Sequence, residues 1–202
     1  MALVQVRKAQ FVVGASGAKA FPVWDLSEVA FAGRSNVGKS SALKALTGGK
    51  CSVRVSKTPG RTREINVFEL DLVDRPSVAF VDLPGYGYAS VPLKMRAQWG
   101  PLVRSYLEDR ANLKAVVLLC DVRRGPEDEE LGLVEWLDER SIDWIAVCTK
   151  SDKLAKSKVK PAVWQAARAL GIPASRAVAF SAKTGFGVDE VWRRILRLCG
   201  PK

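Results

Sequence analysis

The feature that most constrains the fold of this chain is an eight-residue segment, Gly33-Arg34-Ser35-Asn36-Val37-Gly38-Lys39-Ser40, which fits the phosphate-binding pattern G-x-x-x-x-G-K-[ST]. Gly33 and Gly38 allow backbone conformations closed to other residues, so that successive N–H groups can converge on phosphate oxygens. Lys39 is expected to reach the β- and γ-phosphates, and the Ser40 hydroxyl to bind a Mg²⁺ ion that bridges them.

The residues on either side predict the strand and the helix that such a loop needs. Residues 28–32 read as a short buried strand, and residues 41–46, which begin with Ser41, read as a helix that Gly48 and Gly49 close. The helix would direct the positive end of its dipole at the bound anion. The alternative is a chance glycine-rich turn, which would not explain a match placed between a strand and a helix.

Length and composition favour one α/β domain. The chain has 202 residues, of which 48% are hydrophobic, enough for one core. We expect residues 1–25 to be a lead-in packed on the domain and residues 26–202 to be the single domain. No apolar run approaches the roughly 20 residues that span a bilayer, and residues 1–7 lack the apolar part of a secretory signal, so we expect a cytoplasmic protein without membrane insertion. Scattered cysteines and the lack of histidine predict reduced thiols and no zinc site.

The net charge of +11 is high for a small globular protein. Long-range attraction to a polyanion such as RNA is the most economical use of such charge. Charge alone does not identify the polyanion, and simple solubility is the alternative, because the basic residues are spread over the whole length.

Strands and helices alternate along the rest of the chain. The predicted strands are 28–32, 65–72, 77–82, 115–120, 144–148 and 177–180, and the predicted helices after 41–46 are 93–108, 127–140, 158–170 and 188–198. Residues 73–76 are too short for a crossover helix, so strands 65–72 and 77–82 should be antiparallel. We therefore expect a mostly parallel six-stranded sheet with one antiparallel edge strand and helices on both faces.

Two later motifs follow predicted strands, at the strand ends where ligands bind in open α/β sheets. Asp82 begins the segment Asp82-Leu83-Pro84-Gly85 and is expected to hold Mg²⁺ through water. Gly85 has no side chain to obstruct its N–H group on the way to the γ-phosphate. The spacing D-x-x-G is common in ordinary turns, and its position after an apolar strand and downstream of the phosphate loop makes it specific.

A carboxylate after strand 144–148 predicts the choice of base. In Thr149-Lys150-Ser151-Asp152, the Asp152 carboxylate can accept hydrogen bonds from N1–H and the N2 amino group of guanine, whereas adenine has no donor at N1. The stem of Lys150 would lie along the purine. Ser181-Ala182-Lys183 follows the next strand and would support guanine O6 through the Ala182 N–H group.

The polar segment 50–63 has the position of a switch loop that senses the γ-phosphate. A threonine here can place its hydroxyl on Mg²⁺ and its N–H group on the γ-phosphate. We choose Thr62 over Thr58, because Thr62 lies closer to the following strand. When the γ-phosphate orders this loop, Lys57, Arg61 and Arg63 would face outward, where they could meet the phosphates of a polyanion such as RNA.

These segments, in this order, resemble a translation-factor-class GTPase, and more closely the EngB/YihA/YsxC family of ribosome-biogenesis GTPases, in the TrmE-Era-EngA-EngB-septin-like class of P-loop GTPases. The resemblance rests on the phosphate loop through Ser41 and on the strings K-T-P-G-R-T (57–62), D-L-P-G-Y-G-Y-A (82–89) and T-K-S-D (149–152). It implies a Ras-like fold over residues 29–198, GTP and GDP binding with Mg²⁺, slow GTP hydrolysis and a role in assembling the large ribosomal subunit. It also brings Gly60 into the nucleotide site and Lys39, Thr62 and Gly85 into the catalytic machinery, in a protein that we expect to be a monomer.

Two residues of these motifs bear on the mechanism. Tyr86 follows Gly85 where Ras-like enzymes place the glutamine that orients the attacking water, so slow intrinsic turnover follows. Asn36 resembles the asparagine that coordinates K⁺ in several related GTPases, where the ion supplies positive charge in place of an arginine finger. Asn36 could equally be a turn-forming residue of the loop.

Three functions remain in view. The chain could be a GTPase switch for ribosome assembly, a GTP-dependent signalling switch that acts on a protein partner, for example in cell division, or an RNA-binding module that hydrolyses nothing. The first is favoured. The third conflicts with the Mg²⁺ and guanine motifs, because RNA affinity requires neither.

Overall fold

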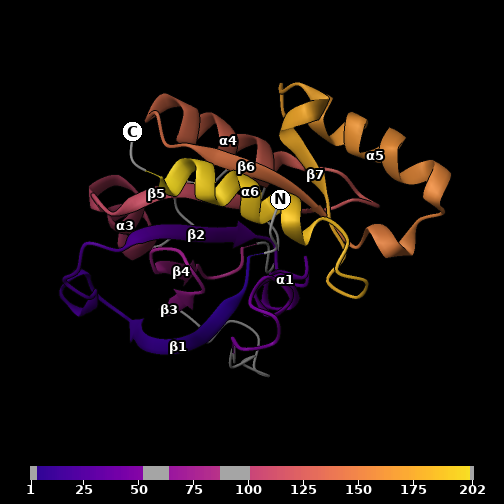
Figure 1. Cartoon of the computed structure of the whole chain (residues 1–202). Helices are drawn as coiled ribbons and strands as arrows, with labels where there is room; N and C mark the ends of the chain where they lie inside the picture. The colour runs from indigo at the N-terminus through magenta and orange to yellow at the C-terminus, as the bar shows by residue number, and fades with distance from the viewer. Residues whose placement is uncertain (1–3, 52–63, 87–100, 201–202) are drawn as a thin grey trace.

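Seven strands form one mixed sheet in the order β1-β3-β4-β2-β5-β6-β7, in a computed structural model that describes residues 4–51, 64–86 and 101–200 (Figure 1). The strands are β1 (Val6–Ala15), β2 (Ser27–Gly33), β3 (Ile65–Leu72), β4 (Val78–Asp82), β5 (Leu113–Asp121), β6 (Trp144–Thr149) and β7 (Ala177–Ala179). The five strands from β4 to β7 in this order are parallel, whereas β3 is antiparallel to β4 and β1 is antiparallel to β3.

The expected class, a mostly parallel Ras-like sheet with helices on both faces, is confirmed, and two details of it need correction. The sheet has seven strands rather than six, and the antiparallel strand β3 is not at its edge, because β1 covers it. Strand β1 pairs with β3 from Val6 opposite Leu72 to Ala15 opposite Ile65. Most of its side chains are exposed or half-buried, so it lacks the apolar pattern that marks a buried strand.

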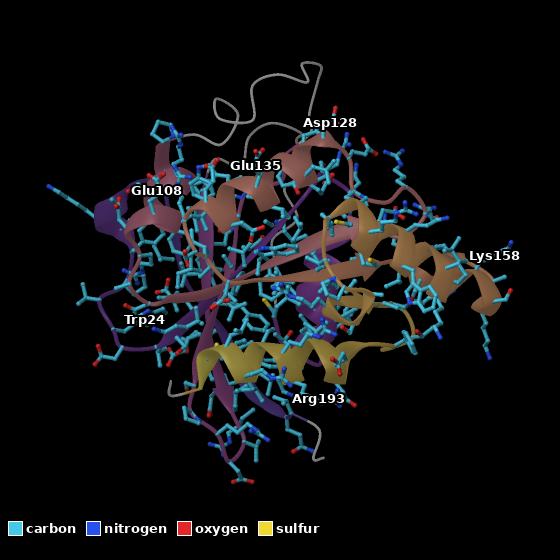
Figure 2. The ribbon with its side chains drawn as sticks, turned by 90° about the horizontal axis from the view of Figure 1, so that it is seen from above. Trp24, Glu108, Asp128, Glu135, Lys158 and Arg193 are labelled. Carbon is cyan, nitrogen blue, oxygen red and sulfur yellow. The ribbon has the colours of Figure 1, made fainter. Side chains whose placement is uncertain are left out.

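Helices cover both faces of the sheet (Figures 1 and 2). The described helices are α1 (Lys39–Leu46), α3 (Pro101–Asp109), α4 (Asp128–Glu139), α5 (Lys156–Ala169) and α6 (Val188–Cys199), with 3-10 turns η1 (Ala18–Ala20), η2 (Ser151–Lys153) and η3 (Ala174–Arg176). One core cluster joins the buried side chains of α3, α4 and α5, and a second joins those of α1 and α6. Figure 2 shows α4, labelled at Asp128 and Glu135, and α6, labelled at Arg193, on opposite sides of the strands.

Aromatic packing fixes α6 to the strands that carry the phosphate loop. Phe80 on β4 packs against Phe31 on β2, with ring centroids 4.6 Å apart, and stacks on Trp192 of α6 at 5.1 Å. The Trp192 indole N–H group also donates a 2.8 Å hydrogen bond to the Leu46 carbonyl at the end of α1. The two helices of this face are therefore held to one another and to β2 and β4 by the same buried side chain.

A buried carboxylate joins the segment before β2 to helix α3 and to the loop that follows it. Glu28 is only 1% exposed, and it accepts hydrogen bonds from Trp24 (2.7 Å), Tyr106 (2.8 Å) and Arg110 (2.5 Å). Arg110 also donates to the Pro22 carbonyl at 2.7 Å. A buried charge is tolerated when it is paired and hydrogen-bonded in this way.

The parallel strands end together at one edge of the sheet. Asp82 pairs with Phe31, Gly33 with Leu119, and Asp121 with Thr149 across neighbouring strands. Because these strands are buried along their length, their ends are the first positions at which polar side chains can meet a ligand. The four cysteines are free thiols, and no helix within the described ranges is long and apolar enough to cross a membrane.

Candidate functional site

The phosphate loop folds closely over the end of β2. A Cβ atom on Gly33 would lie 2.9 Å from Val37 Cγ1 and 3.0 Å from the Leu119 carbonyl oxygen, so a larger residue would push the loop away from β5. Gly38 has φ +105°, a conformation that favours glycine, and directly precedes the first helical residue, Lys39. Both glycines thus stand where the backbone requires them.

The start of α1 is suited to an anion. A backbone hydrogen bond from Ala42 to the Gly38 carbonyl opens the helix, and the N–H groups of Lys39, Ser40 and Ser41 have no carbonyl one turn back to bind. Unsatisfied N–H groups and the helix dipole together favour phosphate at this position.

Lys39 lies beside the predicted Mg²⁺ ligands. Its ammonium group forms an ion pair with the carboxylate of Asp82, which is 5% exposed at the end of β4. Ser40 is the next residue of the helix and is half-buried. Carboxylate and hydroxyl oxygens are the donors that Mg²⁺ prefers, so the residues present fit a Mg²⁺ ion bound together with phosphate groups.

The Gly85 segment lies directly against the phosphate loop. A Cβ atom on Gly85 would be 3.4 Å from the backbone nitrogen of Ser35, which is van der Waals contact. The Ser35 N–H group donates a 2.8 Å hydrogen bond to the Tyr86 carbonyl, and Arg34 and Tyr86 form an isolated parallel bridge. The phosphate loop and the D-x-x-G turn are therefore one bonded unit.

A buried threonine joins the base segment to the phosphate loop. The Thr149 hydroxyl, at the end of β6, donates to the Val37 carbonyl at 2.7 Å and lies 3.1 Å from the Cys120 carbonyl of β5. Thr149 is 2% exposed, so this contact is shielded from water. The Thr149 hydroxyl therefore holds the phosphate loop to the ends of β5 and β6, and its place in the nucleotide site stays a prediction.

The Lys150 side chain also joins the segment after β6 to the phosphate loop. It adopts φ +60°, and its ammonium group donates to the Asn36 carbonyl at 2.6 Å and pairs with Asp121 at 3.0 Å. Its Cε atom would be 3.8 Å from a Cβ on Gly38, so the stem runs beside the phosphate loop. The predicted contact of this stem with a purine stays a prediction.

Asp152 is held by the loop that follows β7. The Ser181 hydroxyl donates a 2.7 Å hydrogen bond to Asp152 Oδ1, and this bond lowers the pKa of the Asp152 carboxyl below its ordinary value, with a smaller contribution from Lys153 and Lys183. Ser181 is buried, Ala182 is half-buried and Lys183 is exposed. The two predicted base-recognition segments therefore meet, with Asp152 kept as an anion.

Asp121 belongs to this edge but was not among the residues predicted for the site. It accepts hydrogen bonds from Arg123 at 2.7 and 2.9 Å and pairs with Lys150. Burial opposes ionisation, yet the hydrogen bonds from Arg123 and Lys150 lower the pKa of Asp121 below its ordinary range. Its position directly at the end of β5, like that of Asp82 on β4, is the signal that could have identified it.

Helix α4 contacts the phosphate loop and the D-x-x-G turn through three glutamates. Arg34 pairs with Glu127 and lies 3.3 Å from Glu129, so its side chain faces α4. Tyr86 is 5% exposed and its hydroxyl interacts with Glu130, which is 2% exposed. The position at which Ras-like enzymes orient water is therefore occupied here by a side chain buried against a helix.

Two predicted residues, Gly60 and Thr62, lie outside the described residues, as do the switch-loop cations Lys57, Arg61 and Arg63 and part of the predicted helix 93–108. Asn36 is exposed with φ +61°, a left-handed conformation that asparagine tolerates well. This geometry accounts for a turn-forming asparagine, and its possible role as a K⁺ ligand stays a prediction.

Comparison with known proteins identifies the family. Residues 28–150 match the family described as 50S ribosome-binding GTPase. A probable GTP-binding protein EngB of Syntrophotalea carbinolica is 45% identical over 192 residues, 95% of this chain and 91% of that protein. The chain belongs to the EngB family of GTP-binding proteins. Its relative in Myxococcus xanthus, also described as a probable GTP-binding protein EngB, is 41% identical over 201 residues, 98% of each chain.

Solved structures agree with this assignment. The crystal structure of a probable GTP-binding protein EngB has a TM-score of 0.64 and 29% identity, and the match covers 85% of this chain and 98% of that one. Era in complex with MgGDPNP and a segment of 16S ribosomal RNA has a TM-score of 0.67 and 25% identity, covering 88% of this chain and 58% of Era. As an EngB-family GTPase, the chain binds guanine nucleotides and hydrolyses GTP.

Replacing Asp152 with asparagine tests the base-recognition site. Asp152→Asn turns part of the guanine acceptor into a donor, so GTP affinity should fall by about 10- to 150-fold, the range of a hydrogen bond to a charged group. Affinity for xanthosine triphosphate should rise. Competition binding with both nucleotides measures the change, and Asp143→Asn, at an exposed position, is the control. Full guanine selectivity in Asp152→Asn would show that another group reads the base.

Glu130 should make stability depend on pH. Burial raises the pKa of the Glu130 carboxyl, although hydrogen bonds to the Glu127 N–H group and Tyr86 oppose this. The folded state then binds the proton more tightly than the unfolded chain, so Glu130 makes stability fall as pH rises from its ordinary value of 4.5 to the raised one. Glu130→Gln keeps an acceptor for the Glu127 N–H group and should remove this fall.

Urea unfolding of the wild type, Glu130→Gln and the exposed control Glu135→Gln between about pH 4.5 and 8 measures the effect. As pH rises, the free energy of unfolding of the wild type should fall relative to that of Glu130→Gln. It should change in parallel with that of Glu135→Gln. Parallel curves for all three proteins would mean that Glu130 is ionised without cost.

Proposed function

We propose that this GTPase binds GTP together with Mg²⁺ and acts as a switch in assembly of the large ribosomal subunit. The observation that carries the nucleotide cycle is the meeting of Lys39, Asp82 and the Gly85 turn at one edge of the sheet. The family description, 50S ribosome-binding GTPase, supports the partner. The proposal places the protein in the cytoplasm as a monomer.

The residues divide the chemistry between binding and positioning. Lys39 and the N–H groups of the first α1 turn would hold the β- and γ-phosphates, while Ser40, Asp82 and Thr62 would hold the ion. Gly60 is assigned to the nucleotide site by the family motif. Mg²⁺, when bound, neutralises charge that develops on the phosphate oxygens. Gly85 brings its N–H group to the γ-phosphate, while Asp152, Lys150 and Ala182 bind the base.

Turnover without a partner should be slow. Tyr86 is buried against Glu130, so the side chain after Gly85 does not reach an attacking water. Catalysis then rests on positioning and on positive charge near the phosphates, which is the larger part of phosphoryl transfer in any case.

Two independent features support ribosomal RNA as the partner. The chain carries a net charge of +11, and log affinity for a nucleic acid rises with the number of phosphates that are neutralised. Era, which shares this fold over 58% of its own chain, was crystallised with a segment of 16S ribosomal RNA, so the fold occurs in a protein that binds ribosomal RNA. A signalling switch that acts on a protein in cell division would not need the high positive charge.

Co-sedimentation with purified large ribosomal subunits tests the ribosome role. The wild type should bind more tightly with a non-hydrolysable GTP analogue than with GDP, and Lys39→Ala should lose this difference, because it cannot hold the triphosphate. Binding of the wild type to the subunits should also weaken as the salt concentration rises. Absence of binding in every nucleotide state would refute the ribosome role and leave the GTPase activity in place.

A second experiment decides the role of Asn36. If Asn36 holds K⁺, the wild type should hydrolyse GTP faster in KCl than in equimolar NaCl, and Asn36→Gly should abolish the difference. Glycine accepts φ +61° without strain, so this variant removes the side chain and leaves the loop conformation intact. A potassium effect that Asn36→Gly retains would assign Asn36 to turn formation alone, and nucleotide titration should show unchanged GTP affinity.

A further inference from the structure

Much of the excess positive charge lies in one stretch of the sequence, and most of its basic residues lie outside the nucleotide site. Between Asp152 and Asp189 the sequence has no aspartate or glutamate and seven basic residues, Lys153, Lys156, Lys158, Lys160, Arg168, Arg176 and Lys183. The whole chain has a net charge of +11. Helix α5 holds four of these seven residues, and it lies beside the edge strand β7 at one end of the molecule, where Figure 2 labels Lys158.

Helix α5 carries a stripe of exposed residues at four-residue spacing, Lys156, Lys160, Trp164 and Arg168, which we call the α5 stripe. Residues four apart lie on the same face of a helix. Val163, Ala166 and Ala167 of the same helix are buried. The stripe winds along one flank of this buried strip, from Lys156 beside it to Arg168 farther round the helix, and all four of its residues are exposed.

The stripe also contains an exposed aromatic residue, Trp164. Trp164 is 54% exposed, and the Lys160 ammonium group lies 4.9 Å from its ring centroid. None of the ion pairs among the described residues involves Lys156, Lys160 or Arg168. The stripe thus combines un-neutralised cations with a large flat ring that is half open to water.

We propose that the α5 stripe is a docking surface for ribosomal RNA, with Lys156, Lys160 and Arg168 on backbone phosphates and an unpaired base stacked on Trp164. This proposal rests on the ribosome role proposed above and adds the part of the protein that makes the contact. Basic side chains interleaved with an exposed aromatic ring are the means by which proteins hold single-stranded nucleic acid.

Other polyanions fit the stripe less well. A membrane surface requires a continuous apolar face beneath the cations, whereas Trp164 is the only exposed large hydrophobic residue on α5. The acidic side chains of a protein partner would pair with the cations, but they would not stack on the exposed indole ring of Trp164. A base has the flat π-face that matches this ring, and its phosphates match the charge.

Charge reversal on the stripe tests the phosphate contacts. Lys160→Glu/Arg168→Glu is compared with Lys8→Glu/Lys19→Glu, which makes the same change in net charge at exposed positions on β1 and η1. The affinity of each for purified large subunits, with the non-hydrolysable GTP analogue, is measured over a series of KCl concentrations. The α5 variant should bind at least about tenfold more weakly and lower the slope of log affinity against log salt by about 1.4 to 1.8, since two phosphate contacts are lost.

Substitution of Trp164 tests the stacking. Trp164→Ala should weaken subunit binding about five- to tenfold, the lower part of the range for one stacked base, and Trp164→Phe should restore most of it. Titration with fluorescent GDP should give wild-type affinity for every variant, which shows that the fold and the nucleotide site are intact.

The outcomes separate this proposal from the ribosome role itself. Wild-type protein that fails to bind subunits refutes the ribosome role. Wild-type protein that binds, with the α5 variants equal to the Lys8→Glu/Lys19→Glu control, refutes the α5 stripe alone and leaves the contact to other surfaces. Stripe-dependent binding to phosphatidylglycerol vesicles, with subunit binding unchanged, would replace RNA by a membrane.

Discussion

The geometry of the site depends on one buried hydroxyl. Thr149, at the end of β6, donates to the Val37 carbonyl and touches the Cys120 carbonyl, and so holds the ends of β5 and β6 to the phosphate loop after β2. The loop can lie this close because Gly33 has no Cβ to meet Leu119. Gly33 and Thr149 thereby fix the position of the phosphate loop relative to the segment after β6, which is predicted to bind the base.

The same principle explains why so many charged groups gather at this edge. Strands β4, β5 and β6 are buried on both faces, and a charge within them would be costly without a partner. Asp82 and Asp121 instead stand at the strand ends, where Lys39 and Lys150 pair with them. The folded protein therefore keeps its ionised residues as neighbours of the ligand position, where their charge can act on phosphate and base.

The sequence predicted the strands whose carboxyl ends carry the motifs, but it did not predict β1, the outermost strand on one side of the sheet. Motifs such as 33–40 and 149–152 follow short apolar strands, and both position and chemistry are local, so periodicity and spacing were sufficient. Strand β1 pairs with the distant strand β3, from Val6 opposite Leu72 to Ala15 opposite Ile65. Exposed and half-buried residues occur on both faces of β1, so its sequence shows no alternation of buried and exposed positions. Asp121 could have been identified from its place at the end of β5, as Asp82 was at the end of β4. Glu127, Glu129 and Glu130 were missed because their partners, Arg34 and Tyr86, come from distant segments, which no pattern within one segment records.

Helix α4 contacts two parts of the candidate site. Arg34 of the phosphate loop pairs with Glu127, which caps the helix, and with Glu129 of its first turn, and the Tyr86 hydroxyl interacts with Glu130. Because Ser35 also donates to the Tyr86 carbonyl, a displacement of the Gly85 turn would disturb its contacts with the phosphate loop and with α4 at once. Tyr86, at the position where Ras-like enzymes orient water, is therefore a buried contact between the Gly85 turn and α4.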